Sequence, residues 1–152
     1  MNSPQVVVSR DDILELQSHL MQYDQIDCPL EHFFAPGVYG RQIFMPAGAV
    51  VVGKIHKHAH LNNISQGRCI VATEFGKMEI VAPFQFISQP GTKRAVYVVE
   101  DTIWTTYHPH DLGDVSEDDL ERIEDHVIAK SFDDYDEYAL GVELVKQLEV
   151  FS

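Results

Sequence analysis

Between residues 38 and 108 the chain alternates short segments rich in Val, Ile, Phe, Tyr and Thr with turns that contain glycine or proline. Such residues suit pleated, half-buried strands, and short strands at this spacing are typical of a β-sandwich or barrel. The predicted strands are 38–45, 50–58, 68–75, 77–81, 84–88, 95–99 and 103–107. The predicted turns are 46–48, 66–67, 76, 89–91 and 100–101.

Helical patterns flank this region on both sides. Ser9 and Asp12 have the spacing of a capping box, which predicts a helix that starts there and ends near Tyr23. Its apolar face is expected to contain Ile13, Leu16 and Leu20.

The C-terminal region repeats the same signals. Ser116 with Asp119 predicts a second capped helix, with one apolar face formed by Leu120, Ile123 and Val127. A third helix is expected over about 134–148, anchored by Tyr138, Val142, Val145 and Leu148. We therefore expect a single domain over 1–152, made of an N-terminal helical arm (1–34), a β-barrel (35–110) and an acidic helical extension (111–152).

The net charge of −13 is concentrated at one end of the chain. Residues 1–99 contain eight acidic and eight basic side chains, whereas residues 100–152 contain 16 acidic and three basic ones. An acidic end repels phosphate backbones, so nucleic acid is not expected as a direct partner. The acidic end is either a solvated surface or a surface that docks on a basic protein.

Features of export and membrane insertion are missing from the sequence. No apolar run approaches the ~18 residues of a membrane span, and the first residues do not resemble a secretory signal. Cys28 and Cys69 are therefore expected to be reduced thiols in a cytoplasmic setting.

The segment from Lys54 to Asn62 contains three alternating histidines: His56, His58 and His60. In a regular strand they share one face with Asn62, and imidazole is a good ligand for divalent transition metals. We expect one ion (Zn, Fe, Ni or Mn) to bind there. A straight strand would spread the three histidines over ~13 Å, so either the strand bends, or only two of them bind, or all three are surface residues.

The order of motifs resembles the cupin family. A Pro-x-Gly turn at 46–48 precedes clustered histidines, and Gly67 occupies the position of the glycine that ends the first cupin motif. On that alignment His60 stands where the family has glutamate, His56 is the second motif histidine and Lys54 replaces the first; a shifted alignment makes His56 and His58 the pair. The second motif has its turn at 90–94 without its histidine. The resemblance implies a mainly β fold, a cupin-type double-stranded β-helix (jelly-roll barrel), with an incomplete set of the usual metal ligands.

More of the chain resembles a family of small cupin-like proteins encoded by tailed bacteriophages. The segments that carry this resemblance include 28–29, 35–39, 53–57, 60–62, 90–94, 100–106 and 128–132. It implies a phage protein in the host cytoplasm or the virion, with phage structural proteins and further copies of the chain as partners.

Arg94 and Asn62 are the other candidate ligand-binding residues, since a guanidinium inside a barrel would hold an anion. His32, His108 and His110 are weaker candidates, for which surface positions are the commoner outcome. The sequence favours a non-enzymatic virion or assembly accessory, because the metal motifs are incomplete. The alternative is a metal-dependent enzyme or small-molecule-binding cupin that uses the His56–His60 segment.

Overall fold

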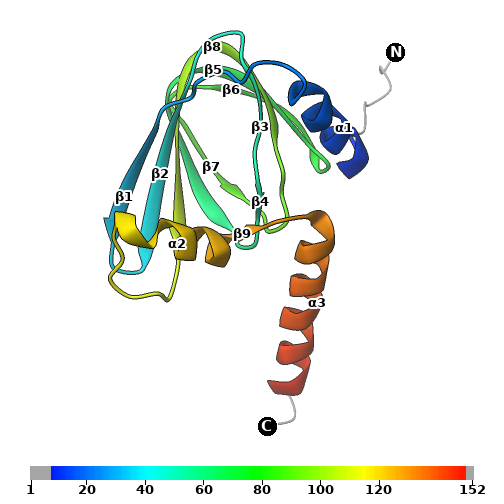
Figure 1. Cartoon of the computed structure of the whole chain (residues 1–152), viewed down its shortest axis with the longest axis vertical. Helices are drawn as coiled ribbons and strands as arrows, with labels where there is room; N and C mark the ends of the chain where they lie inside the picture. Colours follow the sequence, from blue (N-terminus) through cyan, green and yellow to red (C-terminus); the bar gives the residue numbers. More distant parts are fainter. Residues whose placement is uncertain (1–7, 150–152) are drawn as a thin grey trace.

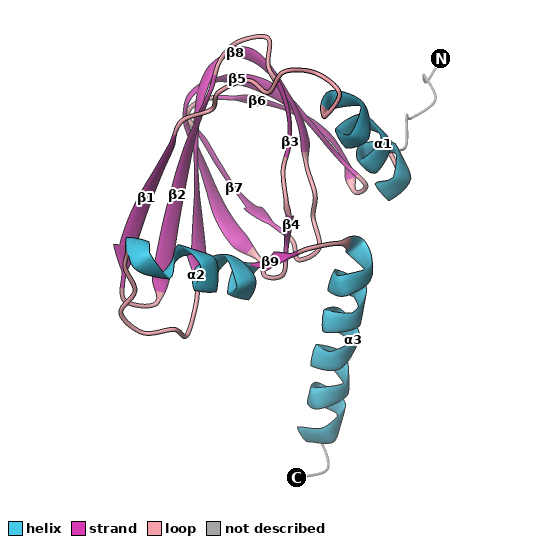
Figure 2. Ribbon diagram, viewed as in Figure 1, coloured by secondary structure: helices cyan, strands magenta, loops and turns pink. Residues whose placement is uncertain are grey.

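The computed structural model describes residues 8–149 and contains a barrel of antiparallel strands with helices at both ends of the chain (Figures 1 and 2). The strands are β1 Leu30–Ala35, β2 Val38–Met45, β3 Val50–Val52, β4 Ile55–His56, β5 His60–Thr73, β6 Gly76–Val81, β7 Phe84–Ser88, β8 Ala95–Pro109 and β9 Ile128–Ala129. The helices are α1 Arg10–Leu20, the 3-10 turn η1 Glu117–Asp119, α2 Leu120–Val127 and α3 Phe132–Glu149. The mainly β, cupin-type prediction is confirmed.

Two long strands, β5 and β8, pair along most of their length and belong to both walls of the barrel. At one end, β8 lies between β5 and β2, with β1 and β7 outside them. At the other end, β8 lies between β5 and β3, with β6 on the far side of β5. The short pair β4–β9 is separate from this sheet.

The pairing of β5 with β8 is interrupted around Gly67, where the register shifts between Ile64 and Cys69. Gly67 has φ +101°, and a Cβ there would lie 2.3 Å from the Asp101 carbonyl oxygen. Only glycine fits this position, and an irregularity of this kind bends a strand. Because β5 and β8 bend here, the same two strands continue from one wall of the barrel into the other.

Two turn predictions are wrong at this bend. The predicted turn at 66–67 lies inside β5, and the predicted turn at 100–101 lies inside β8. Glycine and acidic residues were interpreted as chain reversals, whereas they occupy an irregularity within continuous strands. The predicted strands 38–45 and 84–88 coincide with β2 and β7.

The main core fills the end of the barrel opposite β4. Its buried members are Met45, Ala49, Ile64, Cys69, Val71, Ile80, Val96, Val98 and Trp104. In β8, Val96 and Val98 alternate with the exposed Tyr97, as a period-two strand requires. Cys28 and Cys69 are both free thiols.

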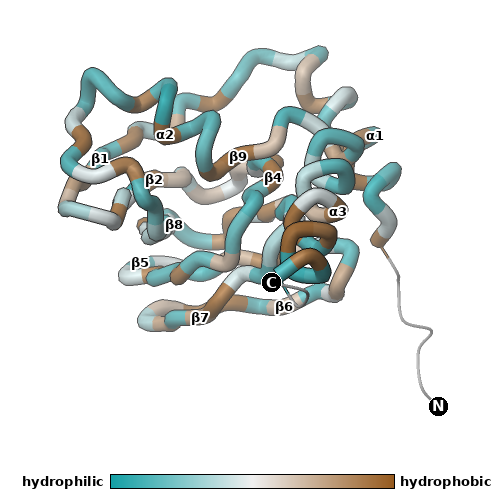
Figure 3. The backbone as a smooth tube through the Cα atoms, turned by 90° about the horizontal axis from the view of Figure 1, so that it is seen from below, coloured by the Kyte–Doolittle hydropathy of each residue, from teal (hydrophilic) through white to brown (hydrophobic). Residues whose placement is uncertain are grey.

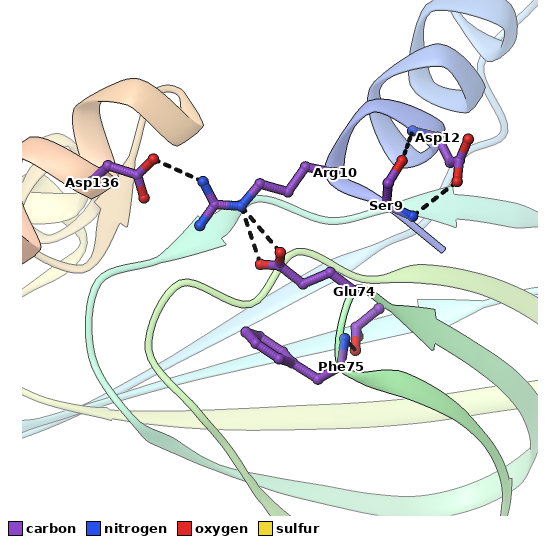
Figure 4. A network of polar contacts seen from close by, with 7 residues as sticks. Ser9, Arg10, Asp12, Glu74, Phe75 and Asp136 are labelled. Atoms are coloured by element: carbon purple, nitrogen blue, oxygen red, sulfur yellow. Dashed lines mark hydrogen bonds and ion pairs between the residues drawn. The ribbon is translucent and has the colours of Figure 1, made fainter. Parts of the chain in front are cut away.

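Helix α1 begins as predicted, because Ser9 and Asp12 form the expected reciprocal capping box. Arg10 in its first turn joins three elements (Figure 4). It forms ion pairs with Glu74 of the β5–β6 hairpin and with Asp136 of α3, and its guanidinium lies 4.4 Å from the Phe132 ring centroid. These contacts hold the starts of α1 and α3 against the hairpin.

Helix α3 starts at Phe132, earlier than predicted, and projects away from the barrel (Figure 1). Its first turns pack on β4 through Phe132 and Tyr135. Three of the four predicted anchors, Val142, Val145 and Leu148, are exposed, and hydrophobic residues are visible along this helix in Figure 3. These three residues therefore anchor the helix to no other element within residues 8–149, because the helix leaves the barrel surface. Among residues 8–149, no helix is long and apolar enough to cross a membrane.

Candidate metal centre

A bend between β4 and β5 brings two of the predicted histidines together. The strand predicted over 50–58 is interrupted at residues 53–54 and ends at His56, and residues 57–59 turn before β5 starts at His60. Backbone contacts fix this bend: Gly91 N–H donates to the His56 carbonyl over 2.8 Å, and Lys57 N–H donates to the Val127 carbonyl over 2.8 Å. The His56 and His60 ring centroids lie 4.4 Å apart.

The third member of the cluster is His108, close to the end of β8. Its ring stacks on His56 with centroids 5.1 Å apart, and it lies 4.7 Å from the His60 ring. One nitrogen from each of the three rings lies within 4.8 Å of the others. Ligands on one tetrahedral ion with bonds of ~2.1 Å would lie roughly 3.4 Å apart, so small ring rotations bring these nitrogens to ligand spacing.

Hydrogen bonds orient two of these rings. His108 Nε2 lies 2.8 Å from Thr106 Oγ1. A proton on Nε2 leaves Nδ1 unprotonated, so the Nδ1 lone pair is available to a metal ion. His60 Nδ1 lies 3.3 Å from the His58 carbonyl oxygen, which can only accept a hydrogen bond. Nδ1 therefore carries the proton of the neutral ring, and Nε2 keeps its lone pair. Such partners on the second ring nitrogen are typical of histidines that bind metals.

The local environment keeps the three imidazoles neutral at physiological pH. Desolvation, followed by the charges of the neighbouring rings and of Arg94, lowers the pKa of His56 well below its usual range. Desolvation and Arg94 lower the pKa of His60 to about 4. Desolvation and His60 lower the pKa of His108 to about 3. Neutral imidazole is the form that binds a metal.

His58 is not part of this cluster. Its ring faces the C-terminal helices, where Nε2 lies 3.3 Å from the His126 carbonyl and Nδ1 lies 3.4 Å from the Tyr138 hydroxyl. The bend at residues 57–59 places His58 on the opposite side of the chain from His56 and His60. His32 contacts Tyr39, and His110 accepts from the Leu112 N–H.

Arg94 lies directly beside the cluster. Its Nη1 donates to Ser88 Oγ over 2.7 Å and to Asn62 Oδ1 over 3.1 Å, and it lies 3.5 Å from His60 Nε2. The guanidinium also lies 4.8 Å from the Trp104 ring centroid. Desolvation, together with the Arg41 charge, lowers the pKa of Arg94 to about 10, so it remains a cation at neutral pH.

Asn62 holds this arrangement in place and is fully buried. Its Oδ1 accepts from Arg94 and from Trp104 Nε1, the latter over 2.9 Å, while its Nδ2 donates to Ser88 Oγ over 2.9 Å. The structure therefore places Asn62 behind Arg94, with the polar atoms of its side chain already engaged.

His108 was considered only as a weak candidate, although a signal for it was present. Trp104 is buried, and residues two and four positions later in a strand share its face. Thr106 and His108 are both buried on that face. The signal was missed because a break was predicted near 100–101 and the strand was expected to end at Tyr107.

Comparison with solved structures shows the same fold in other proteins. The chain is similar to ectoine synthase from P. lautus, with 9% identity over 67% of this chain and 75% of that one and a TM-score of 0.51. It is also similar to KdgF from Halomonas sp., with 16% identity over 60% of this chain and 90% of that one and a TM-score of 0.45. A cupin-2 domain protein from Shewanella frigidimarina matches with 8% identity over 62% and 92% of the two chains and a TM-score of 0.44.

These likenesses concern the fold alone. The chain has the cupin fold, with three histidines gathered inside the barrel. No family model and no curated protein matches the sequence.

Proposed function

We propose that this protein is a metal-binding cupin that holds one divalent transition-metal ion through His56, His60 and His108 and binds a small molecule beside it. The observation that carries the proposal is the convergence of three ligand nitrogens, from separate positions in the sequence, within 4.8 Å of one another. Of the functions expected from the sequence, this is the alternative rather than the favoured one.

The donor set favours particular ions. Three neutral imidazoles suit zinc, iron, copper or nickel, whereas manganese prefers carboxylate ligands. A bound ion of this kind would act as a Lewis acid on a ligand oxygen. The chain itself contributes the oriented rings, the positive charge of Arg94 and the apolar wall around them.

The proposal can be tested by elemental analysis of protein purified without an affinity tag, combined with titration of the metal-free protein with Co²⁺ and Zn²⁺. We expect about one ion per chain in the wild type. His60→Ala or His108→Ala should weaken binding at least tenfold, on the order of the loss of one ligand. His58→Ala is the matched control, because His58 lies in the same segment and faces away from the cluster.

Two results would contradict the proposal. One is the absence of stoichiometric binding in the wild type. The other is an equal loss of binding in His58→Ala and His60→Ala, which would indicate a site on the protein surface.

The assembly role expected from the sequence, with phage structural proteins as partners and further copies of the chain, stays a prediction. The exposed apolar side chains of α3, among them Leu140, Val145 and Leu148, are compatible with it. Light scattering on the full chain and on a chain that ends at Ala139 measures the oligomeric state with and without this surface. A monomer in both cases would contradict the expected homo-oligomer.

A further inference from the structure

A second feature of the barrel interior extends the proposed function from a metal to a class of organic ligand. A pocket of about 570 Å³ opens between β6, β7 and the 89–94 loop, and Arg94 is one of its lining residues. This volume lies within the usual range for small-molecule sites. We call it the Arg94 pocket. Its other lining residues include Val71, Lys77, Met78, Phe86 and Ile87.

Val71, Met78 and Phe86 of the Arg94 pocket belong to the inner face of the barrel, whereas Ile87 is exposed on the outer face. Met78 pairs with Val71 across β5 and β6, one step from the buried pair Ile80 and Cys69 on the same face. Phe86 pairs with the inward-facing Asn62. Arg94 lines this pocket and its Nη1 also lies 3.5 Å from His60 Nε2, so Arg94 lies between the pocket and the histidine cluster.

The hydrogen bonds of Arg94 leave one edge of its guanidinium available. Every hydrogen bond that the Arg94 side chain makes within residues 8–149 uses Nη1. Nε and Nη2, which form the side-on fork of an arginine, donate to no side chain or carbonyl in that part of the chain. This fork matches the two oxygens of a carboxylate.

The charges around the fork also favour an anion. Arg94 forms no ion pair with any carboxylate in the described part of the chain, and Arg41 adds a second positive charge nearby. The pocket is lined by Lys77 and Arg94 without a single acidic residue, although the chain has a net charge of −13. A cation kept inside a barrel without a counter-ion is a costly arrangement unless a ligand supplies one.

We infer that the Arg94 pocket binds an organic acid with one carboxylate head and an apolar body. The carboxylate is held by Nε and Nη2 of Arg94, and the apolar body lies along Val71, Met78 and Phe86. Asn62, Ser88 and Trp104 act as positioning residues, because they hold Nη1 and the guanidinium plane and so direct the free fork. The head group then lies beside His60.

The test uses three eight-carbon probes that differ only in the head group: octanoate, octanol and octylamine. Calorimetry on the full chain should show saturable binding of octanoate, at least about tenfold tighter than octanol, and no saturable binding of octylamine. Arg94→Met should remove the preference for octanoate over octanol. Arg94→Lys, which keeps the charge and loses the fork, should weaken octanoate binding about tenfold.

Two further variants separate the pocket from general effects of charge and folding. Arg68→Met removes an arginine that pairs with Glu79 on the outside of the barrel, and octanoate binding should not change. Met78→Trp fills the apolar part of the pocket without touching Arg94, and octanoate binding should fall at least about tenfold. Thermal melting confirms that each variant is folded.

The inference is overturned if octanoate does not bind the wild type, if octanol binds equally well, or if Arg94→Met binds octanoate as the wild type does. Measurements on chelator-treated and zinc-loaded protein separate it from the proposed function. Arg94-dependent octanoate binding without any histidine-dependent metal supports the pocket and contradicts the metal site. Histidine-dependent metal binding without octanoate binding supports the metal site and contradicts the inference about the pocket.

Discussion

Arg94 and Asn62 are joined inside the barrel by a hydrogen bond of 3.1 Å, and the Asn62 oxygen that accepts it also accepts from Trp104. One buried amide therefore fixes both the cation and the aromatic ring beneath it. A guanidinium held this firmly loses little further freedom when it binds a ligand, which favours affinity.

The first prediction concerns this amide. Asn62→Leu removes the acceptor for Arg94 and Trp104 and leaves their donors inside the barrel, so we expect a loss of about 2–4 kcal/mol in the free energy of unfolding. Urea denaturation measures it. Asn63→Leu is the matched control, because the neighbouring side chain lies on the other face of β5; it should change stability by no more than about 0.5 kcal/mol. Equal effects of the two changes would contradict the role given to Asn62.

The second prediction concerns the bend shared by β5 and β8. Gly67→Ala combines a positive φ with a Cβ that would lie 2.3 Å from a backbone oxygen, and we expect a loss of about 3 kcal/mol or more. Gly48 also has a positive φ, but nothing lies within 4 Å of its Cβ position. Gly48→Ala should therefore cost only about 1–2 kcal/mol. Chemical denaturation of both variants tests the comparison, which fails if Gly48→Ala is the more harmful change.

The third prediction concerns the pH dependence of the metal-free protein. Because the folded state lowers the pKa of His56, His60 and His108, the unfolded chain takes up protons first as the pH falls below about 6.5. Stability is therefore complete above that pH and decreases toward the folded pKa values, about 4 for His60 and about 3 for His108. Each histidine contributes at most about 1.4 kcal/mol per pH unit.

Urea denaturation of chelator-treated protein between about pH 7 and about pH 4.5 measures this slope. A His60→Gln, His108→Gln variant should show a shallower slope over the same range. An unchanged slope would show that other groups cause the acid sensitivity.

The fourth prediction concerns the link between the two ends of the chain. Arg10→Met removes ion pairs with Glu74 and Asp136 and the contact with the Phe132 ring. Since Arg10 is one third exposed, we expect a loss of only about 1–2 kcal/mol. Arg68→Met removes a more exposed single pair with Glu79 and should change stability by about 0.5 kcal/mol or less. Thermal melting of the two variants compares them directly.

Local signals in the sequence were sufficient for much of the fold. The capping box at Ser9 and the strands 38–45 and 84–88 depend on short-range patterns, whereas the cupin-type barrel was predicted from the resemblance in the order of motifs. Strand β1 was missed because residues 30–34 were assigned to a helical arm. The exposure of the candidate anchors of α3 could not be predicted, because apolar residues in a helix do not indicate which surface, if any, covers them.

The site was only partly predictable, and for a geometric reason. The period-two rule places His56, His58 and His60 on one face only if the strand is straight. Whether it bends depends on contacts made by Gly91 and Val127, which are distant in sequence. The same long-range pairing brings His108 to the cluster, and no local pattern contains that information.

The position of Arg94 has a consequence for how this chain can be improved. Replacing a desolvated, unpaired charge by an apolar side chain of similar volume commonly raises stability. Selection for thermal stability alone would therefore favour Leu or Met at position 94. The resulting barrel would be more stable and unable to bind a carboxylate ligand. A stabilised version of this protein should be screened with position 94 held constant, since otherwise the variants that melt at the highest temperature will be those that have lost their ligand.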